Sequence, residues 1–193
     1  MDMITTLGRT LGFSLAAGVN LYATVALLGL ASRFGWVNLP EQFQAFNNDW
    51  LIGAAIAMYL LEFFADKVPY VDTLWDIVHT AIRPVGGALI AVTTLGEASP
   101  GTQALIALLG GTVAASSHLT KTSTRAAANA SPEPFSNWFL SLGEDVFVVG
   151  LGYLAMSHPL AALIVGVVLL MVIASFAVVI IRTVRRWFRR VPA

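Results

Sequence analysis

The chain has 193 residues, of which 57% are hydrophobic and only 11% are charged. A soluble domain usually carries about 25% charged residues to cover its surface, so this deficit, with a mean hydropathy of +0.76, indicates a protein that resides in lipid. Basic and acidic residues balance at 11 each and cysteine is absent, which argues against a nucleic-acid partner and excludes disulfides, thiolate metal sites and thiol nucleophiles.

The N-terminal half contains three apolar stretches. Residues 7–31 have no charge after Arg9 and predict a retained first span rather than a cleaved leader. Residues 32–49 are rich in Asn and Pro and predict a polar loop. A second span is expected over residues 50–65, before a polar turn that ends in Pro69.

The third stretch, residues 73–95, is long enough to cross a membrane but is interrupted. Its first half contains Asp76, His79 and Arg83, and Pro84 breaks its middle. Two interpretations stay open. One is a single kinked helix, and the other is an amphipathic or re-entrant segment over residues 72–83 followed by a short apolar half.

Three further spans are expected over residues 102–120, 135–156 and 160–181, and the last of these has no charge. Five arginines follow it, from Arg182 to Arg190. The apolar stretches together predict a multi-pass protein of about six transmembrane helices. Because Lys and Arg accumulate on the cytoplasmic side, the tail predicts a cytoplasmic C-terminus, and an even number of spans then places the N-terminus on the same side.

An internal similarity suggests how these spans are organised. The segment Leu11–Thr24 aligns with Leu109–Thr122, with six of fourteen positions identical. More weakly, Pro84–Leu89 resembles Pro159–Ile164. The interpretation is two inverted three-helix repeats, residues 1–97 and 98–182, followed by a basic cytoplasmic tail at 183–193. The alternative is that apolar helices rich in Ala, Gly and Leu align by chance.

Ionisable and polar groups at membrane depth are costly unless paired or hydrated, so they mark candidate sites. Asn20 and His118 occupy aligned positions and are expected to face each other. The candidate ion- or substrate-binding residues are Asn20, Glu62, Asp66, Asp76, His79, Arg83, His118, Glu144 and Asp145.

Two other interpretations of these residues remain. The acids and bases form a purely structural ion-pair network, or Arg83, Lys121 and Arg125 bind an anionic lipid headgroup. No catalytic residue or cofactor is predicted, because the sequence has no phosphate loop, no HExxH and no dinucleotide fingerprint, and whether a metal binds is left open.

The run Leu61–Asp76, which contains Glu-x-x-x-Asp-Lys-x-Pro-x-x-Asp, resembles an uncharacterised bacterial membrane family, domain of unknown function 4126. The segments Gly18–Thr24 and Thr80–Leu89 resemble it too. The resemblance implies a small multi-span protein of the bacterial cytoplasmic (inner) membrane and supplies no activity.

The leading functional hypothesis is a small transporter or channel for an ion or small solute that uses intramembrane carboxylates. The alternatives are a lipid-phosphate carrier or enzyme, and a structural or accessory subunit without substrate. The expected partners are the lipid bilayer and an unidentified ion or solute, with a homodimer as one option and no nucleic acid.

Overall fold

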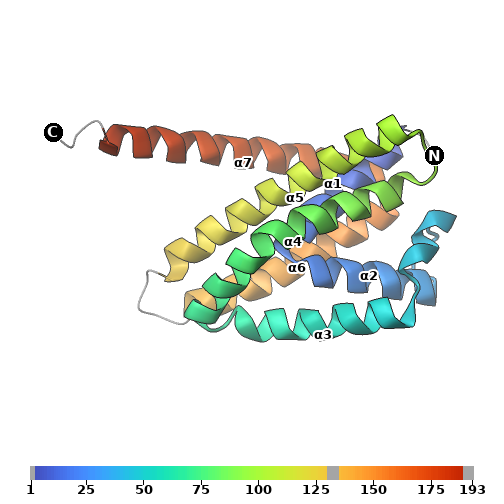
Figure 1. The fold of residues 1–193 in the computed structure, drawn as a ribbon, viewed down its shortest axis with the longest axis horizontal. Coiled ribbons are helices and arrows are strands. Elements are labelled where there is room, and N and C mark those ends of the chain that lie inside the picture. Colours follow the sequence, from blue (N-terminus) through green and yellow to red (C-terminus); the bar gives the residue numbers. More distant parts are fainter. Residues whose placement is uncertain (1–2, 130–134, 189–193) are drawn as a thin grey trace.

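The computed structural model describes residues 3–129 and 135–188, which form eight helices and no strand. The expected all-α fold is therefore confirmed (Figure 1). In chain order the elements are α1 (Met3–Val19), α2 (Leu21–Phe34), the 3-10 helix η1 (Glu41–Phe46), α3 (Asp49–Ala65), α4 (Pro69–Leu95), α5 (Pro100–Asn129), α6 (Phe135–Ser157) and α7 (Pro159–Phe188).

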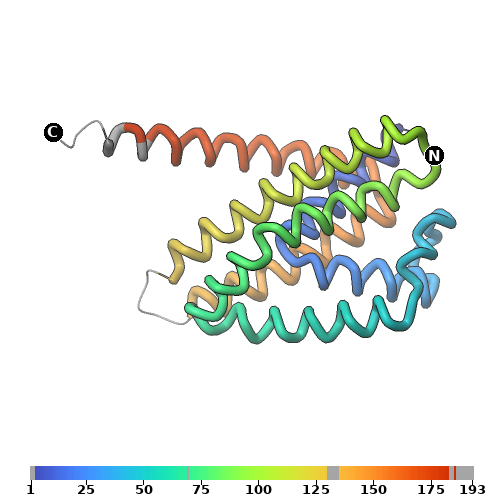
Figure 2. Tube along the Cα trace, viewed as in Figure 1, coloured from blue at the N-terminus to red at the C-terminus, as the bar shows by residue number. Residues whose placement is uncertain are grey.

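Three helical segments are long and apolar enough to cross a membrane: Tyr70–Leu95, Phe135–Ser157 and Pro159–Arg182. They indicate a multi-pass membrane protein. Helix α7 leans away from the bundle over its C-terminal half (Figures 1 and 2), and only 6% of its apolar window is buried. It runs to Phe188, so the start of the expected basic tail is helical, whereas Arg189 and Arg190 lie outside the described residues.

The first expected span is not one helix. It is divided at Asn20, whose φ of −147° and ψ of 99° are extended rather than helical. The Asn20 side chain accepts a hydrogen bond from the Ala23 backbone N–H and caps the start of α2. Asparagine is among the best N-cap residues because its carbonyl satisfies a backbone donor that a helix start leaves free.

Helices α1 and α2 form a hairpin (Figure 1), and the chain turns between them at the extended residue Asn20. Arg9, near the start of α1, donates to the backbone oxygen of Met156 at the end of α6. Trp36, just after α2, lines a cavity with the same Met156. Both arms therefore return to one end of the bundle, whereas α7 ends at the opposite end (Figure 2).

Helix α4 is continuous. It runs from Pro69 to Leu95 with Pro84 inside it, so the expectation of a separate re-entrant segment over residues 72–83 is wrong, and a kink at Pro84 stays a prediction. The helix is held against α5 by a glycine contact: a Cβ on Gly110 would lie 2.9 Å from the Gly87 oxygen. Close backbone approach of this kind drives helix association in lipid.

The expected inversion of the two repeats does not hold for α1 and α5. Ser117 Oγ donates to Leu15 O and Lys121 Nζ donates to Val19 O, so residue numbers rise together along both helices and the helices are parallel. Inverted repeats require corresponding helices to run in opposite directions. The shared Gly and Ala spacing instead reflects a common need for close packing.

The expected polar loop over residues 32–49 contains the short helix η1. Its Phe43 is fully buried and packs edge-on against Phe13 of α1, with ring centroids 5.8 Å apart. Gln42 also donates to the backbone oxygen of Thr94 in α4. The loop therefore closes the open end of the α1–α2 hairpin.

Candidate functional site: a buried ionic network

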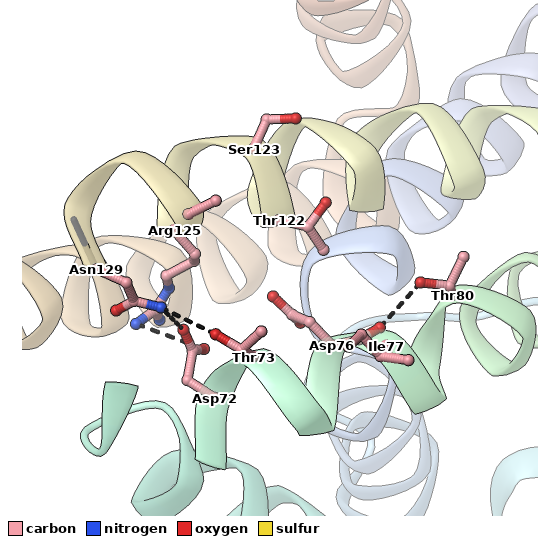
Figure 3. A pocket seen from close by; sticks show the side chains of 10 residues that line it. Asp72, Thr73, Asp76, Ile77, Thr80, Thr122, Ser123, Arg125 and Asn129 are labelled. Carbon is pink, nitrogen blue, oxygen red and sulfur yellow. Dashed lines mark hydrogen bonds and ion pairs between the residues drawn. The ribbon is translucent and has the colours of Figure 1, made fainter. Parts of the chain in front are cut away.

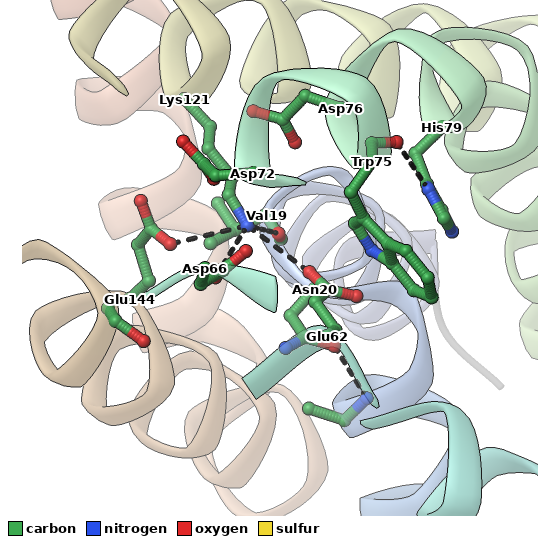
Figure 4. A network of polar contacts seen from close by, with 12 residues as sticks. Val19, Asn20, Glu62, Asp66, Asp72, Trp75, Asp76, His79, Lys121 and Glu144 are labelled. Carbon is green, nitrogen blue, oxygen red and sulfur yellow. Dashed lines mark hydrogen bonds and ion pairs between the residues drawn. The ribbon is translucent and has the colours of Figure 1, made fainter. Parts of the chain in front are cut away.

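Eight charged side chains from the α3, α4, α5 and α6 region meet inside the bundle. Figure 4 labels all of them except the two arginines. Seven of them are almost inaccessible, and the Glu144 side chain is 16% exposed. The group, called the ionic network below, consists of Glu62, Asp66, Asp72, Asp76, Glu144, Arg83, Lys121 and Arg125.

Helical spacing brings these groups together. Glu62 and Asp66 are four residues apart at the end of α3, and Lys121 and Arg125 have the same spacing on α5. On α4, Asp72 and Asp76 also lie four residues apart. Side chains four residues apart project from one helix face, so each helix presents a charged stripe to the others.

Arg83 and Lys121 share Glu62. Arg83 Nη2 lies 2.7 Å from Glu62 Oε1, and both side chains have no exposed surface. Lys121 Nζ lies 3.2 Å from Glu62 Oε1, 3.2 Å from Asp66 Oδ2 and 3.3 Å from Glu144 Oε2. The acids and bases therefore do form an ion-pair network, as one of the interpretations of the sequence expected.

Arg125 binds two carboxylates of the network, those of Glu144 and Asp66. Its Nε and Nη2 donate to the two Glu144 oxygens at 3.0 and 2.6 Å, which is the bidentate geometry that favours arginine. Nη2 also lies 3.0 Å from Asp66 Oδ2. Beyond it, Asn129 donates to Asp72 Oδ2 at 3.0 Å and accepts from Asn137 at 2.7 Å.

The break at Asn20 contributes directly to the network. A helix end leaves backbone carbonyls without intrahelical partners and carries partial negative charge. At the end of α1, Gly18 O accepts from Arg83 Nη1 at 3.3 Å and Val19 O accepts from Lys121 Nζ at 3.2 Å. The two cations therefore satisfy the carbonyls that the break exposes.

That Asn20 and His118 face each other stays a prediction, because their hydrogen bonds go to other residues. Both are buried, and Arg83 contacts the α1 end and His118 at once: its Nη1 lies 2.7 Å from His118 Nδ1. Arginine can only donate, so Nδ1 accepts and is unprotonated. His79 lies nearby, 2.9 Å from the Tyr22 hydroxyl and 2.7 Å from Trp75 O.

The network has more acids than bases, five carboxylates to three cations. Four of the carboxylates keep a buried oxygen that has no hydrogen-bond partner: Glu62 Oε2, Asp66 Oδ1, Asp72 Oδ1 and Asp76 Oδ1. Buried polar atoms are normally satisfied, so these oxygens are acceptors that the network leaves without a donor, and one donor of the network, Arg83 Nε, is also without a hydrogen-bond partner.

Two cavities reach the network. One of about 340 Å³ lies between α4 and α5 and is lined by Asp72, Asp76 and several hydroxyl groups (Figure 3). The other, of about 350 Å³, is mostly apolar and reaches Lys121 and Glu144 from between α5, α6 and α7. Within residues 3–129 and 135–188, no group of three or more His, Cys, Asp or Glu is arranged to hold a metal ion.

The structure places most candidate residues in the ionic network or against it. Asp145 instead lies near Tyr59 and Lys67, beside the network. Asp72, Asn129 and Asn137 are participants that the sequence analysis did not select. For Asp72 a signal existed, because it precedes Asp76 by one helical turn, but its place beside the turn at Pro69 suggested exposure.

The fold and the site define a class: a helical protein with candidate membrane spans, a helix break at Asn20 and a buried, acid-rich ionic network. The chain belongs to the family described as a domain of unknown function, DUF4126, whose model matches residues 7–179. This confirms the resemblance of the Leu61–Asp76 run. No curated protein and no solved structure matches the chain.

Proposed function

We propose that the protein is a small transporter or channel of the bacterial cytoplasmic membrane whose permeating or coupling species is a cation, bound by the ionic network. The observation that carries this proposal is the surplus of carboxylates in a buried site. A net negative charge in a low-dielectric region is unfavourable unless a cation or protons neutralise it.

The α1–α2 hairpin supports the proposal. Broken helices recur at the binding sites of transporters, where freed backbone groups face the substrate or coupling ion. Non-helical backbone at membrane depth is tolerated where it is enclosed by protein or lines a cavity, and Asn20 is 2% exposed. The carbonyls of Gly18 and Val19 place further negative charge in the same region.

For the topology, we propose that α3 to α7 cross the membrane and that α1–α2 enters and returns. This arrangement replaces the six expected crossings and puts the start of α1 opposite the end of α7 (Figure 1). Lys67 and the Arg-rich end of α7 then share the cytoplasmic side, which satisfies the positive-inside tendency. The N-terminus moves to the other side.

The two alternatives have less support. A lipid-phosphate site needs available cations, whereas Arg83, Lys121 and Arg125 each already contact two or more carboxylates. A purely structural network would be expected to neutralise itself. The unpartnered oxygens of Glu62 and Asp76 do not fit that role.

The test is cation flux in proteoliposomes that contain the purified protein, with a potential-sensitive dye as the readout. We expect flux in the wild type and its loss in Glu62→Gln/Asp76→Asn, because the double amide removes two carboxylates from the site. The matched control is Glu41→Gln/Glu97→Gln, which removes two exposed carboxylates outside the network. Full flux in the double amide of the network would contradict the proposal.

A further inference from the structure

We propose that the cavity between α4 and α5 is a binding site for an alkali-metal cation, Na⁺ or K⁺, with Asp72 and Asp76 as its charged ligands. The inference rests on the proposed function and deepens it by naming the site and the class of ion. The cavity of about 340 Å³ lies along the N-terminal part of α4, facing the last turns of α5 (Figure 3).

The two aspartates have unused coordinating capacity. Asp72 is 0% and Asp76 is 4% exposed, and Oδ1 of each has no hydrogen-bond partner. Their ion pairs are long: Arg125 Nη1 is 3.9 Å from Asp72 Oδ1, and Arg83 Nη1 is 3.4 Å from Asp76 Oδ1. Charge-assisted hydrogen bonds to nitrogen are normally about 2.7–2.9 Å long, so neither pairing satisfies its carboxylate.

Figure 3 shows where these groups point. The Asp76 carboxylate extends from α4 toward α5, and Thr122 of α5 projects toward it. The Asp72 carboxylate turns toward Asn129 at the other end of the cavity. The two carboxylates therefore border the space between the helices from the α4 side.

Hydroxyl groups complete the lining. Thr80 donates its proton to the Asp76 backbone oxygen, and Thr122 donates its proton to the Leu119 backbone oxygen. A hydroxyl that donates to a carbonyl keeps lone pairs that can coordinate a cation. The cavity has no cysteine or histidine in its lining, so its ligands are hard oxygens, which suit alkali and alkaline-earth ions rather than transition metals.

The charge of the lining selects a monovalent ion. Counted over the lining residues alone, two carboxylates, Asp72 and Asp76, and one guanidinium, Arg125, leave a single negative charge, and Arg83, 3.4 Å from Asp76, lies outside this count. One alkali cation balances that charge. A divalent ion would leave a buried positive excess beside Arg125, which is unfavourable in a site of low dielectric.

The first test compares thermal unfolding of detergent-purified protein in NaCl, KCl and choline chloride at equal ionic strength. We expect Na⁺ or K⁺ to raise the Tm by roughly 5–10 °C at a concentration about one hundred times its dissociation constant, and choline to leave it unchanged. Asp76→Asn should abolish the shift, and Glu97→Gln, an exposed carboxylate, should keep it.

A second pair of variants separates binding from folding. Thr122→Val removes a lining hydroxyl and should weaken the cation-dependent shift, whereas Thr124→Val removes a hydroxyl with the same kind of bond to its own helix and should not. Equal Tm values for wild type in all three salts, or a shift that survives in both Asp76→Asn and Thr122→Val, would overturn the proposal.

Flux and binding distinguish this inference from the proposed function. Cation-dependent stabilisation without flux supports the site and contradicts transport. Flux that depends on Glu62 but occurs without any alkali-cation shift supports transport and overturns the site. A Tm that responds to pH alone, identically in the three salts, means that protons rather than alkali cations neutralise the surplus carboxylates, and this result also overturns the cation site.

Discussion

Replacing Lys121 by methionine tests the charge imbalance of the ionic network. Lys121 Nζ lies 3.2 to 3.3 Å from three carboxylates, those of Glu62, Asp66 and Glu144. Without it, five carboxylates face two guanidinium groups. Leaving buried charge uncompensated costs about 3–5 kcal/mol. For a chain of this length we expect the Tm to fall by roughly 6–20 °C.

The opposite charge change should be tolerated. Asp76→Asn lowers the acidic surplus and keeps the shape of the side chain, so in choline chloride, where no alkali cation is bound, we expect it to change the free energy of unfolding by less than about 1 kcal/mol. Arg33→Met is the control for loss of a basic residue, because its partner Asp49 has an 85% exposed side chain and such surface pairs contribute about 0–1 kcal/mol.

The assay is thermal unfolding in detergent, followed by the fluorescence of the five tryptophans. The prediction is an asymmetry: loss of a buried cation destabilises strongly, and loss of a carboxylate does not. If Asp76→Asn is as destabilising as Lys121→Met, or if Lys121→Met is as stable as Arg33→Met, the network is not acid-rich in the way the charge count implies.

Two further predictions concern the re-entrant hairpin. Gly18→Ala places a Cβ against the backbone oxygen of Ala114 and should destabilise the protein, whereas Gly53→Ala meets no atom within 4 Å and should be neutral or slightly stabilising; thermal unfolding distinguishes them. The chain has no cysteine, so single cysteines can report topology. With an impermeant thiol reagent, Met3→Cys and Trp36→Cys should label from one side of the membrane and Val68→Cys from the other, and labelling of Met3→Cys and Trp36→Cys from opposite sides would refute the hairpin.

The sequence predicted the helical segments well because their boundaries depend on local signals. The turn before Pro69 and the starts of α3 and α6 agree with the expected spans within a few residues. Candidate acids and bases could also be selected, since ionisable residues stand out in an apolar chain. Which of them share a helix face followed from helical spacing, as for Glu62 and Asp66.

What the sequence could not give depends on tertiary contacts. Asn20 lies within an apolar stretch that is long enough to cross, and its role as a cap becomes visible only when α2 turns back. Pro84 suggests a break, but packing of α4 against α5 keeps the helix continuous. The burial of Asp72 requires Asn129 and Arg125 from α5, which lie more than fifty residues away along the chain.

The break at Asn20 and the surplus of carboxylates are parts of one arrangement. Ending α1 inside the bundle exposes the oxygens of Gly18 and Val19, which take hydrogen bonds from Arg83 and Lys121. The same donors also serve the acids, because Lys121 Nζ lies 3.2 Å from Glu62 Oε1 and Arg83 Nη1 lies 3.4 Å from Asp76 Oδ1. A continuous first helix would satisfy its own carbonyls and leave those donors to the acids. The discontinuity therefore adds two backbone oxygens to the acceptors that share these two cations.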